Sequence, residues 1–191
     1  MGTRGAYGYR IGGVDKVAYN HWDSYPDYLG RQILQYIAEH SVESITEVAS
    51  NITLVDGELP APKDLQEKYK ERANLDVDTG EMSNWYCLLR DCQGDLSTFH
   101  DGVSHMIDAR SFLDDSLFCE WAYIINLDDG CLEVYQGFNK NPKADGRYAN
   151  SKPGRSGYVG VKLIKRIPLG TITLDSFNGI ADELDKIDRE D

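Results

Sequence analysis

The stretch CEWAYIINLDDGCLEVYQGF (residues 119–138) decides the fold class of this 191-residue chain. Two apolar runs flank Asp128-Asp129-Gly130, and an Asp-Gly pair between such runs is a strong signal for a β-hairpin. Two further apolar stretches follow, YVGVKLIKRIPL (158–169) and TITL (171–174), and both are expected to be strands. The carboxyl-terminal half therefore predicts a set of antiparallel strands.

A second hairpin is expected at the start of the chain. The segments TRGAYGYR (3–10) and KVAYNH (16–21) are separated by the glycine-containing linker IGGVD (11–15). Two short strand-like runs joined in this way are typical of a hairpin. Ordered structure is thus expected almost from the first residue.

Helices are expected between these strand regions and at the carboxyl end. Residues 27–39 carry apolar side chains at helical spacing, and Ser41 is a suitable N-cap for a helix that follows. Further helices are expected over residues 62–72, over 84–92 with Ser83 as the cap, and over 175–187 with Asp175 or Ser176 as the cap. Residues 93–118 are expected to be broken helix and loop. Strands and helices segregated along the chain predict an α+β fold, with helices packed on antiparallel sheets.

The chain is expected to form a single domain over residues 1–191, because most domains contain about 100–200 residues. Residues 139–157 are polar and rich in Gly, Pro and Asn, so they predict a long loop, and the acidic residues 185–191 predict a frayed helix end.

The bulk composition limits the classes of function. The net charge of −12 argues against nucleic acid as a partner bound through its phosphates, which needs Lys and Arg. It fits either simple solubility or an acidic face that meets a basic partner. The four cysteines have no disulfide-scaffold spacing and no signal peptide is evident, so a reduced cytoplasmic setting is expected. No apolar run is long enough to cross a bilayer, so no membrane association is expected.

The segment YNHWDSYPDY (19–28) is the densest polar cluster in the sequence. His21 and Asp23 share a face if the chain stays extended there, and Ser24 follows directly, so a nucleophile relay is one interpretation. A second is that Asp23 and Ser24 only satisfy the backbone of a turn and a helix start. A third, compatible with the second, is that Asn20, His21 and Tyr25 face a ligand pocket.

Three weaker patterns remain. Cys87, Cys92, His100 and His105 form a C-x4-C-x7-H-x4-H arrangement whose His spacing suits zinc and whose Cys spacing does not. DVDTGE (76–81) starts like a calcium loop but lacks the later ligands. The loop containing Arg147, Lys152 and Arg155 is the one basic stretch, and together with Arg4 and Arg10 it is the expected contact for an anion.

The opening MGTRGAYGY with the turn NHWDSYP resembles the start of the N-terminal nucleophile hydrolases, in particular the choloylglycine-hydrolase-like members. The chain also resembles a group of bacterial, phage and fungal proteins of unassigned activity that begin Met-Gly-Thr-Arg-Gly. These share YNHWDSYP and CEWAYIINLD. The first resemblance covers about the opening quarter and implies a four-layer αββα sandwich. It departs from the hydrolases at the decisive point, because Gly2 has no side chain to act as the nucleophile.

These observations predict a non-catalytic binding protein with a pocket where the first hairpin meets the central strands. Its ligand is expected to be small and polar or anionic, and nucleotide-like compounds fit. For a phage protein, sequestering a defence signal is one form that such binding takes. The expected site residues are Thr3, Arg4, Asn20, His21, Asp23, Tyr25, Glu120, Asn126 and Arg155, with no metal and no cofactor. The alternatives are an amide or ester hydrolase that uses residues other than position 2, and an acidic inhibitor or protein-interaction module.

Overall fold

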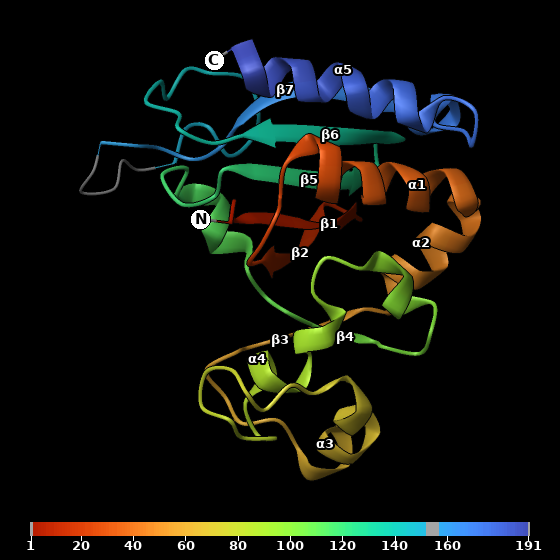
Figure 1. Cartoon of the computed structure of the whole chain (residues 1–191), viewed down its shortest axis with the longest axis vertical. Coiled ribbons are helices and arrows are strands. Elements are labelled where there is room, and N and C mark those ends of the chain that lie inside the picture. The colour runs from red at the N-terminus through yellow and green to blue at the C-terminus, as the bar shows by residue number, and fades with distance from the viewer. Residues whose placement is uncertain (1, 152–156, 191) are drawn as a thin grey trace.

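The protein is a mixed α+β fold built around one five-stranded, mostly antiparallel sheet (Figure 1). The computed structural model describes residues 2–151 and 157–190, with side chains up to residue 187. The sheet has the strand order β2-β1-β5-β6-β7. Its strands are β1 (Gly5–Ile11), β2 (Val14–Asn20), β5 (Trp121–Asn126), β6 (Cys131–Gln136) and β7 (Lys162–Pro168).

Both predicted hairpins are present, and one pairing was not predicted. β1 pairs antiparallel with β2, and β5 pairs antiparallel with β6 across the Asp-Gly turn. β1 also lies beside β5 in parallel, with Gly5 opposite Trp121. Because parallel strands need a long crossover connection, all of the central helices and loops lie between these two strands in the sequence.

One face of the sheet is covered by helices. A π-helical turn (Pro26–Gly30) leads into α1 (Arg31–Glu39), and α2 (Val42–Asn51) follows with Ser41 as its N-cap, as predicted. α1 and α5 (Phe177–Glu190) lie across the same face in Figure 1. Apolar side chains such as Ile33 of α1 and Leu184 of α5 pack in one core with Tyr9 and Tyr123 of the sheet.

The opposite face is covered by irregular segments. The 3-10 turn Arg110–Asp114 supplies Leu113, which packs with Ala6, Ala122 and Ile124 of the sheet. Tyr148, from the predicted long loop, packs against the same cluster. The described part of that loop is therefore docked on the sheet, since Asn139 is also buried and donates to the Gly160 carbonyl at 2.8 Å.

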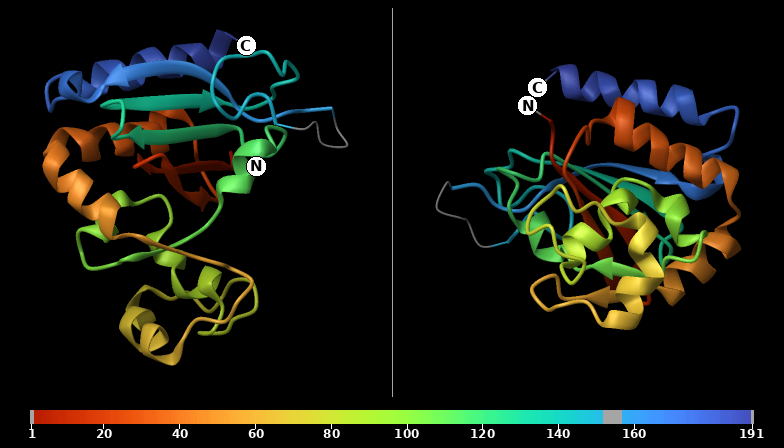
Figure 2. Two further views of the ribbon diagram at one scale, coloured as in Figure 1. Left: turned by 180° about the vertical axis from the view of Figure 1, so that it is seen from behind. Right: turned by 60° about the horizontal axis from the view of Figure 1, so that its bottom comes forward.

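Residues 53–107 form a lobe beyond the β2 edge of the sheet (Figures 1 and 2). The lobe contains β3 (Thr53–Val55), α3 (Lys63–Tyr69), α4 (Trp85–Leu88) and β4 (His105–Ile107). β3 and β4 pair in parallel as a separate two-stranded sheet. These strands have only three residues each, which is too short for an alternating pattern to predict them.

The prediction of a helix over residues 84–92 was wrong in length and in its cap. α4 ends at Leu88, a 3-10 turn follows at Arg90–Cys92, and the N-cap is Asn84, whose side chain accepts from the Cys87 amide. The Tyr7 hydroxyl of β1 donates to the Cys92 carbonyl at 3.2 Å and accepts from the Gly94 amide at 2.9 Å. The sheet thus fixes this backbone in a turn that a helix would not make.

The predicted strand at residues 171–174 was also wrong. Leu169–Thr171 form a 3-10 turn, and a strand is not present from there to α5. Hydroxyl groups satisfy the backbone locally instead: Thr171 donates to the Pro168 carbonyl at 2.7 Å, and Ser176 donates to the Thr171 carbonyl at 2.8 Å. Ser and Thr side chains that bond nearby carbonyls compete with strand pairing in this way.

The four-layer αββα sandwich is not confirmed. The described residues form one five-stranded sheet and the separate β3–β4 pair. α5 continues to Glu190, through most of the stretch that was expected to be a frayed tail. None of the helices in residues 2–151 and 157–190 combines the length and the apolarity that a membrane span requires.

Candidate functional site

A pocket of about 630 Å³ lies at the amino end of β1, and we call it the N-terminal pocket. It is lined by Gly2, Thr3, Arg4, His21, Trp22, Leu117, Phe118, Glu120 and Phe138. The segment before β1 is held in place on both sides. The Ser24 amide donates to the Thr3 carbonyl at 3.1 Å, and the Glu120 amide donates to the Arg4 carbonyl at 3.0 Å. Four of the nine predicted site residues, Thr3, Arg4, His21 and Glu120, therefore meet here.

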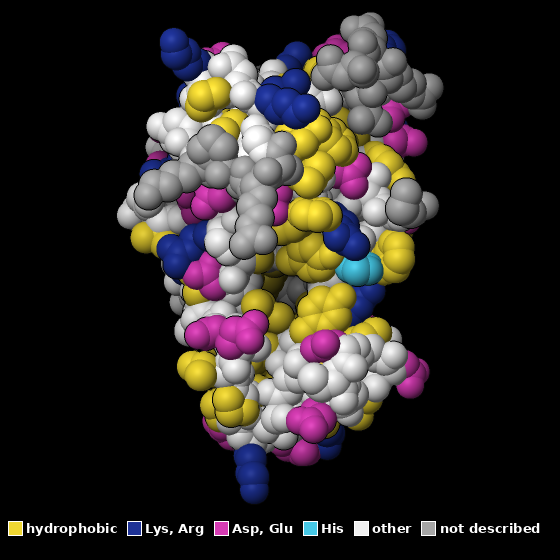
Figure 3. All heavy atoms as spheres, turned by 90° about the vertical axis from the view of Figure 1, so that its left-hand side faces the viewer, with side chains coloured by type: hydrophobic (Ala, Val, Ile, Leu, Met, Phe, Trp, Pro, Cys, Tyr) yellow, Lys and Arg dark blue, Asp and Glu magenta, His cyan; other side chains and the backbone are white. Residues whose placement is uncertain are grey.

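Three large aromatic side chains line this pocket and are about half exposed. The exposed fractions are 52% for Trp22, 48% for Phe118 and 55% for Phe138. The Arg4 guanidinium lies 5.8 Å from the centre of the Phe118 ring. Figure 3 shows this side of the molecule, where hydrophobic side chains are interspersed with Lys and Arg side chains and one histidine. Apolar area left open around a few polar groups is typical of a binding surface.

The backbone is strained at the rim of the pocket. Phe138 has φ +52° and Asp23, next to Trp22, has φ +50°. Such angles are rare for residues other than glycine, and they are unusual for a bulky residue such as phenylalanine. The Phe138 amide donates to the Ser116 carbonyl at 2.7 Å, which holds the strained residue in place. Strain of this kind is concentrated at functional sites, where the surrounding structure enforces it.

His21 lies between cationic neighbours. The Tyr19 hydroxyl and the His21 Nδ1 atom share a hydrogen bond of 2.7 Å. The pKa of His21 is lowered from its ordinary value, first by burial and then by the charges of Arg4 and Arg90. His21 is therefore mostly neutral at pH 7, and the guanidinium groups of Arg4 and Arg90 both lie near it. The same pocket also contains the carboxylate of Glu120, so cationic and anionic groups stand side by side there.

Gly2 packs directly against Trp22. A Cβ atom placed on Gly2 would lie 2.1 Å from the Trp22 Cε3 atom. A side chain at position 2 would have to displace the indole ring. The position that carries the nucleophile in the resembling hydrolases is thus filled by an aromatic side chain.

Asn20, Asp23 and Tyr25 are not part of the N-terminal pocket. Asn20 is buried, and its amide donates to the Trp22 carbonyl at 2.5 Å and to the Ser24 hydroxyl at 2.9 Å. The carbonyl of Tyr25 accepts from the amide of Gly30 at 3.2 Å in the π-helical turn. Tyr25 is therefore a turn residue here, whereas Asn20 and Asp23 line a neighbouring pocket.

The neighbouring pocket measures about 430 Å³, and we call it the polar pocket. Trp22 lines both pockets. The other lining residues come from the turn after β2, from α1 and from the turns after α4: Asn20, Asp23, Tyr28, Leu29, Gln32, Ile33, Gln35, Tyr36, Glu39, Arg90, Gln93, Gly94, Asp95, Leu96 and Ser97.

The relay of His21, Asp23 and Ser24, one of the three interpretations of this segment, required an extended backbone that the structure does not show there. β2 ends at Asn20, and Asp23 has a left-handed backbone with φ +50°. Ser24 is fully buried, and its hydroxyl accepts from Asn20. Asn20 and Ser24 thus fix the turn. The structural interpretation assigned this role to the side chains of Asp23 and Ser24, whereas the π-helical turn that follows has no side-chain cap at its N-cap residue Tyr25.

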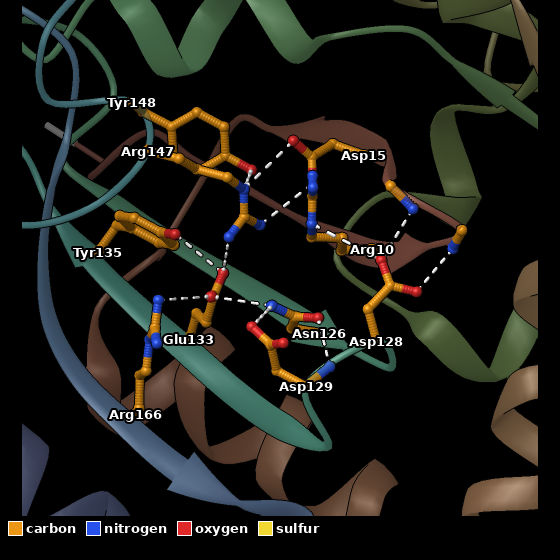
Figure 4. Close-up of polar contacts among 12 residues, drawn as sticks. Arg10, Asp15, Asn126, Asp128, Asp129, Glu133, Tyr135, Arg147, Tyr148 and Arg166 are labelled. Atoms are coloured by element: carbon orange, nitrogen blue, oxygen red, sulfur yellow. Dashed lines mark hydrogen bonds and ion pairs between the residues drawn. The ribbon is translucent and has the colours of Figure 1, made fainter.

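The predicted residue Asn126 lies at the other end of β5, in a polar network shown in Figure 4, and the predicted residue Arg155 is outside the described residues. The centre of the network is Glu133 of β6, which is fully buried. Its carboxylate accepts from Asn126 at 3.0 Å, from Tyr135 at 2.8 Å and from Arg147 at 2.5 Å.

The network extends from Glu133 to the first hairpin. Arg147 also contacts Asp15 of β2 at 3.1 Å, and Asp15 contacts Arg10 of β1 at 3.0 Å. The carboxylate of Asp128 accepts from the amides of Gly12 and Gly13, at 2.7 and 2.8 Å. The expected anion contacts Arg10 and Arg147 are thus neutralised by carboxylates, so this network ties the long loop and two hairpins together and does not form an anion site.

The arrangement of Cys87, Cys92, His100 and His105 does not form a metal site in the described residues, where a group of three or more His, Cys, Asp or Glu side chains suited to a metal ion is not found. Cys87 contacts the Val77 carbonyl at 3.2 Å, His100 contacts the Tyr36 hydroxyl at 2.9 Å and His105 contacts the Tyr69 hydroxyl at 2.7 Å. Each histidine is therefore placed by a tyrosine of a different element.

The sequence interpretation missed Trp22, Phe118, Phe138 and Arg90. Aromatic residues in a strand-rich sequence are normally assigned to the core, and nothing in the local pattern marked these three rings as exposed. The tryptophan inside the polar segment NHWDSYP was the one available signal, because an aromatic residue surrounded by turn residues is poorly placed for burial.

The lowered pKa values of three histidines predict that stability falls in mild acid. Burial is the first cause at His21, His100 and His105. Because each folded-state pKa lies below the unfolded value of about 6.5, the unfolded chain binds more protons as the pH falls. Their contribution is present above the unfolded pKa of about 6.5 and is lost progressively as the pH falls from there through the lower folded-state pKa values. Urea unfolding at pH 7.5, 6.5 and 5.5 measures this, and a free energy of unfolding that rises toward pH 5.5 would contradict it.

Comparison with known proteins adds no assignment to this site: no family model matches the chain, and neither a curated protein nor a solved structure shows significant similarity to it.

Proposed function

We propose that the protein binds, without cleaving it, a small ligand that combines a planar ring with an anionic group, such as a nucleotide, in the N-terminal pocket. The observation that carries this proposal is the gathering of three half-exposed aromatic rings, Trp22, Phe118 and Phe138, around Arg4 and His21 in one pocket. Aromatic rings stack on planar bases with little regard to sequence, and a guanidinium pairs well with phosphate.

The polar groups of the pocket fit the same class of ligand. Arg4 and neutral His21 supply donors for phosphate oxygens. The carboxylate of Glu120, which accepts from the Arg4 amide at 3.4 Å, has lone pairs beyond this contact and adds acceptor character for ring N–H or amino groups. The pocket volume of about 630 Å³ is within the usual range of small-molecule sites. An overall charge of −12 does not prevent this, because the positive groups are concentrated locally.

The side chains in and beside the N-terminal pocket do not pair a nucleophile with a base among the described residues. Gly2 has no side chain, Thr3 and Ser24 are buried, and the His21 Nδ1 atom is already bonded to Tyr19. A base and a nucleophile that contact each other are the usual requirement for covalent catalysis. Under this proposal, the resemblance to N-terminal nucleophile hydrolases describes a scaffold that is used for binding, and the αββα arrangement stays a prediction.

Titration with AMP and GMP tests the proposal by calorimetry and by tryptophan fluorescence. Trp85 and Trp121 are 3% and 2% exposed, so quenching reports mainly on Trp22. At about 0.3 kcal/mol per non-hydrogen atom, a mononucleotide of about 23 such atoms is expected to bind with a dissociation constant near 10 µM. Arg4→Gln should weaken binding about 10- to 150-fold through the loss of a charged hydrogen bond. The control Arg72→Gln, a partly exposed arginine that does not line the N-terminal pocket, should not change it.

Phe138→Gly separates binding from stability. Glycine adopts positive φ without strain, so the variant should remain within about 1 kcal/mol of the parent in free energy of unfolding while it binds AMP at least 10-fold more weakly. The control Leu174→Ala removes a side chain that is 61% exposed and lines neither the N-terminal nor the polar pocket. The proposal fails if neither nucleotide binds below millimolar concentration, or if AMP is hydrolysed by the parent and not by His21→Ala.

A further inference from the structure

The polar pocket differs from the N-terminal pocket in chemistry and shares one wall with it. That wall is Trp22, which lines both. Tyr28, a second aromatic residue that lines the polar pocket, is 54% exposed. The lining also includes uncharged hydrogen-bonding groups, among them the amides of Gln32 and Gln93.

The charges of the polar pocket disfavour a second anion there. Three carboxylates and a single guanidinium line it. Two of the carboxylates are engaged: Glu39 accepts from Gln35 at 2.7 Å, and Asp95 accepts from the Ser97 amide at 2.9 Å. A neutral ligand with many hydroxyl groups suits this lining, because each hydroxyl both donates and accepts and its C–H faces pack on aromatic rings.

Two groups in the polar pocket are available for such a ligand. The Asp23 carboxylate makes no hydrogen bond or ion pair within residues 2–151 and 157–187, although its backbone is held at φ +50°. The Nε atom of Arg90 is buried and lacks a partner among the same residues, while its Nη1 atom donates to Gln93 at 3.3 Å. Strained backbone beside an available carboxylate indicates a contact that the unliganded protein does not make.

Each pocket contributes one guanidinium group near His21. Arg4 lines the N-terminal pocket and Arg90 lines the polar pocket. Both charges lower the pKa of His21, after burial, so both guanidinium groups lie near this side chain. His21 and Trp22 are adjacent in the sequence, and their rings are 4.4 Å apart. A phosphate that bridges the pockets would meet a cation from each side.

We propose that one ligand occupies both pockets: a nucleoside diphosphate joined to a neutral sugar, with the base in the N-terminal pocket, the sugar in the polar pocket and Trp22 between them. This inference rests on the proposed function and extends it to the class of ligand. The sugar hydroxyls donate to Asp23 and accept from Gln32, and the diphosphate lies between Arg4 and Arg90.

Calorimetric titration with ADP and with ADP-glucose tests this proposal. ADP-glucose is expected to bind about 10-fold or more tightly than ADP, since it adds contacts without adding charge. In Asp23→Asn and in Gln32→Ala, the gain from the glucosyl group should fall below about 3-fold while the affinity for ADP stays within about 2-fold. Both variants should fold, because asparagine accepts positive φ well and alanine favours the exposed helix position of Gln32.

The outcomes separate the inference from the proposed function. If ADP binds and ADP-glucose binds no more tightly, the inference is wrong and the proposed function stands. If neither compound binds, the proposed function fails and the inference falls with it. Arg4→Gln should weaken the binding of ADP and of ADP-glucose by the same factor. The control Asp64→Asn, on the exposed surface of α3, should not weaken the binding of either compound. A gain that survives in both Asp23→Asn and Gln32→Ala would also overturn the placement of the sugar.

Discussion

Glu133→Ala is expected to lower the free energy of unfolding by about 3 kcal/mol, because it leaves the buried side chains of Tyr135 and Asn126 without their acceptor and removes one of the two carboxylates paired with Arg147, which is 25% exposed. Glu133 is fully buried on β6, and Arg147 lies 2.5 Å from its carboxylate. Tyr135 and Asn126 would lose their shared acceptor as well. Urea unfolding monitored by circular dichroism measures the change, with the variant and the parent at the same pH.

The matched control is an exposed ion pair. Asp182 lies 2.7 Å from Arg31, but its side chain is 64% exposed, so Asp182→Asn should change the free energy of unfolding by no more than about 1 kcal/mol. The double variant Glu133→Gln with Arg147→Met should recover part of the loss, since Asp15 keeps its contact with Arg10. A change below about 1 kcal/mol for Glu133→Ala would show that the network contributes little to the fold.

Gly8→Ala is expected to lower the free energy of unfolding by about 3 kcal/mol, at the upper end of the range for overpacking. Gly8 lies in the middle of β1, and a Cβ atom there would be 2.0 Å from the Lys16 carbonyl oxygen and 3.0 Å from the Val17 Cα atom. These are backbone atoms of the neighbouring strand β2, so they cannot move aside as a side chain can. The first hairpin would have to separate or change its twist, and the N-terminal pocket would be distorted with it.

Gly179→Ala, a glycine in α5, provides a control with the opposite sign. The residue is exposed, and a Cβ atom added there meets nothing within 4 Å. Because Gly179 lies in the first turn of α5, alanine there should raise the free energy of unfolding by up to about 1 kcal/mol. Thermal unfolding of both glycine variants, followed by calorimetry, checks the pair. Equal effects at the two positions would contradict the steric argument.

The local signals in the sequence were sufficient for the hairpins and for the long amphipathic helices. Asp129-Gly130 between apolar runs placed β5 and β6 correctly, and Ser41 caps α2 as expected. Such features depend on neighbouring residues and on period, which can be read directly from the sequence. The parallel pairing of β1 with β5 depends on contacts between distant segments, so the pattern alone did not predict it.

The candidate site was predictable only in part, for a similar reason. Thr3, Arg4, His21 and Glu120 meet in one pocket, although they come from two distant parts of the chain. The rings of Phe118 and Phe138 were missed because their exposure is set by tertiary packing. Asn126 was misplaced relative to the pocket because the two ends of one strand serve different purposes: Trp121 lies at the pocket end of β5 and Asn126 at the other, beside Glu133.

The parallel contact between β1 and β5 has a consequence for synthesis of the protein on the ribosome. Gly5 of β1 lies opposite Trp121 of β5, so β1 cannot pair with β5 until the ribosome has synthesised most of the chain. At about 5–20 residues per second, the delay is on the order of 6 to 23 seconds. During that interval the nascent hairpin presents Tyr7 and Tyr9, both buried in the finished protein, together with an open strand edge. The hairpin of β1 and β2 is therefore the part of the nascent chain that is most prone to incorrect association, and the part that a chaperone would have to protect.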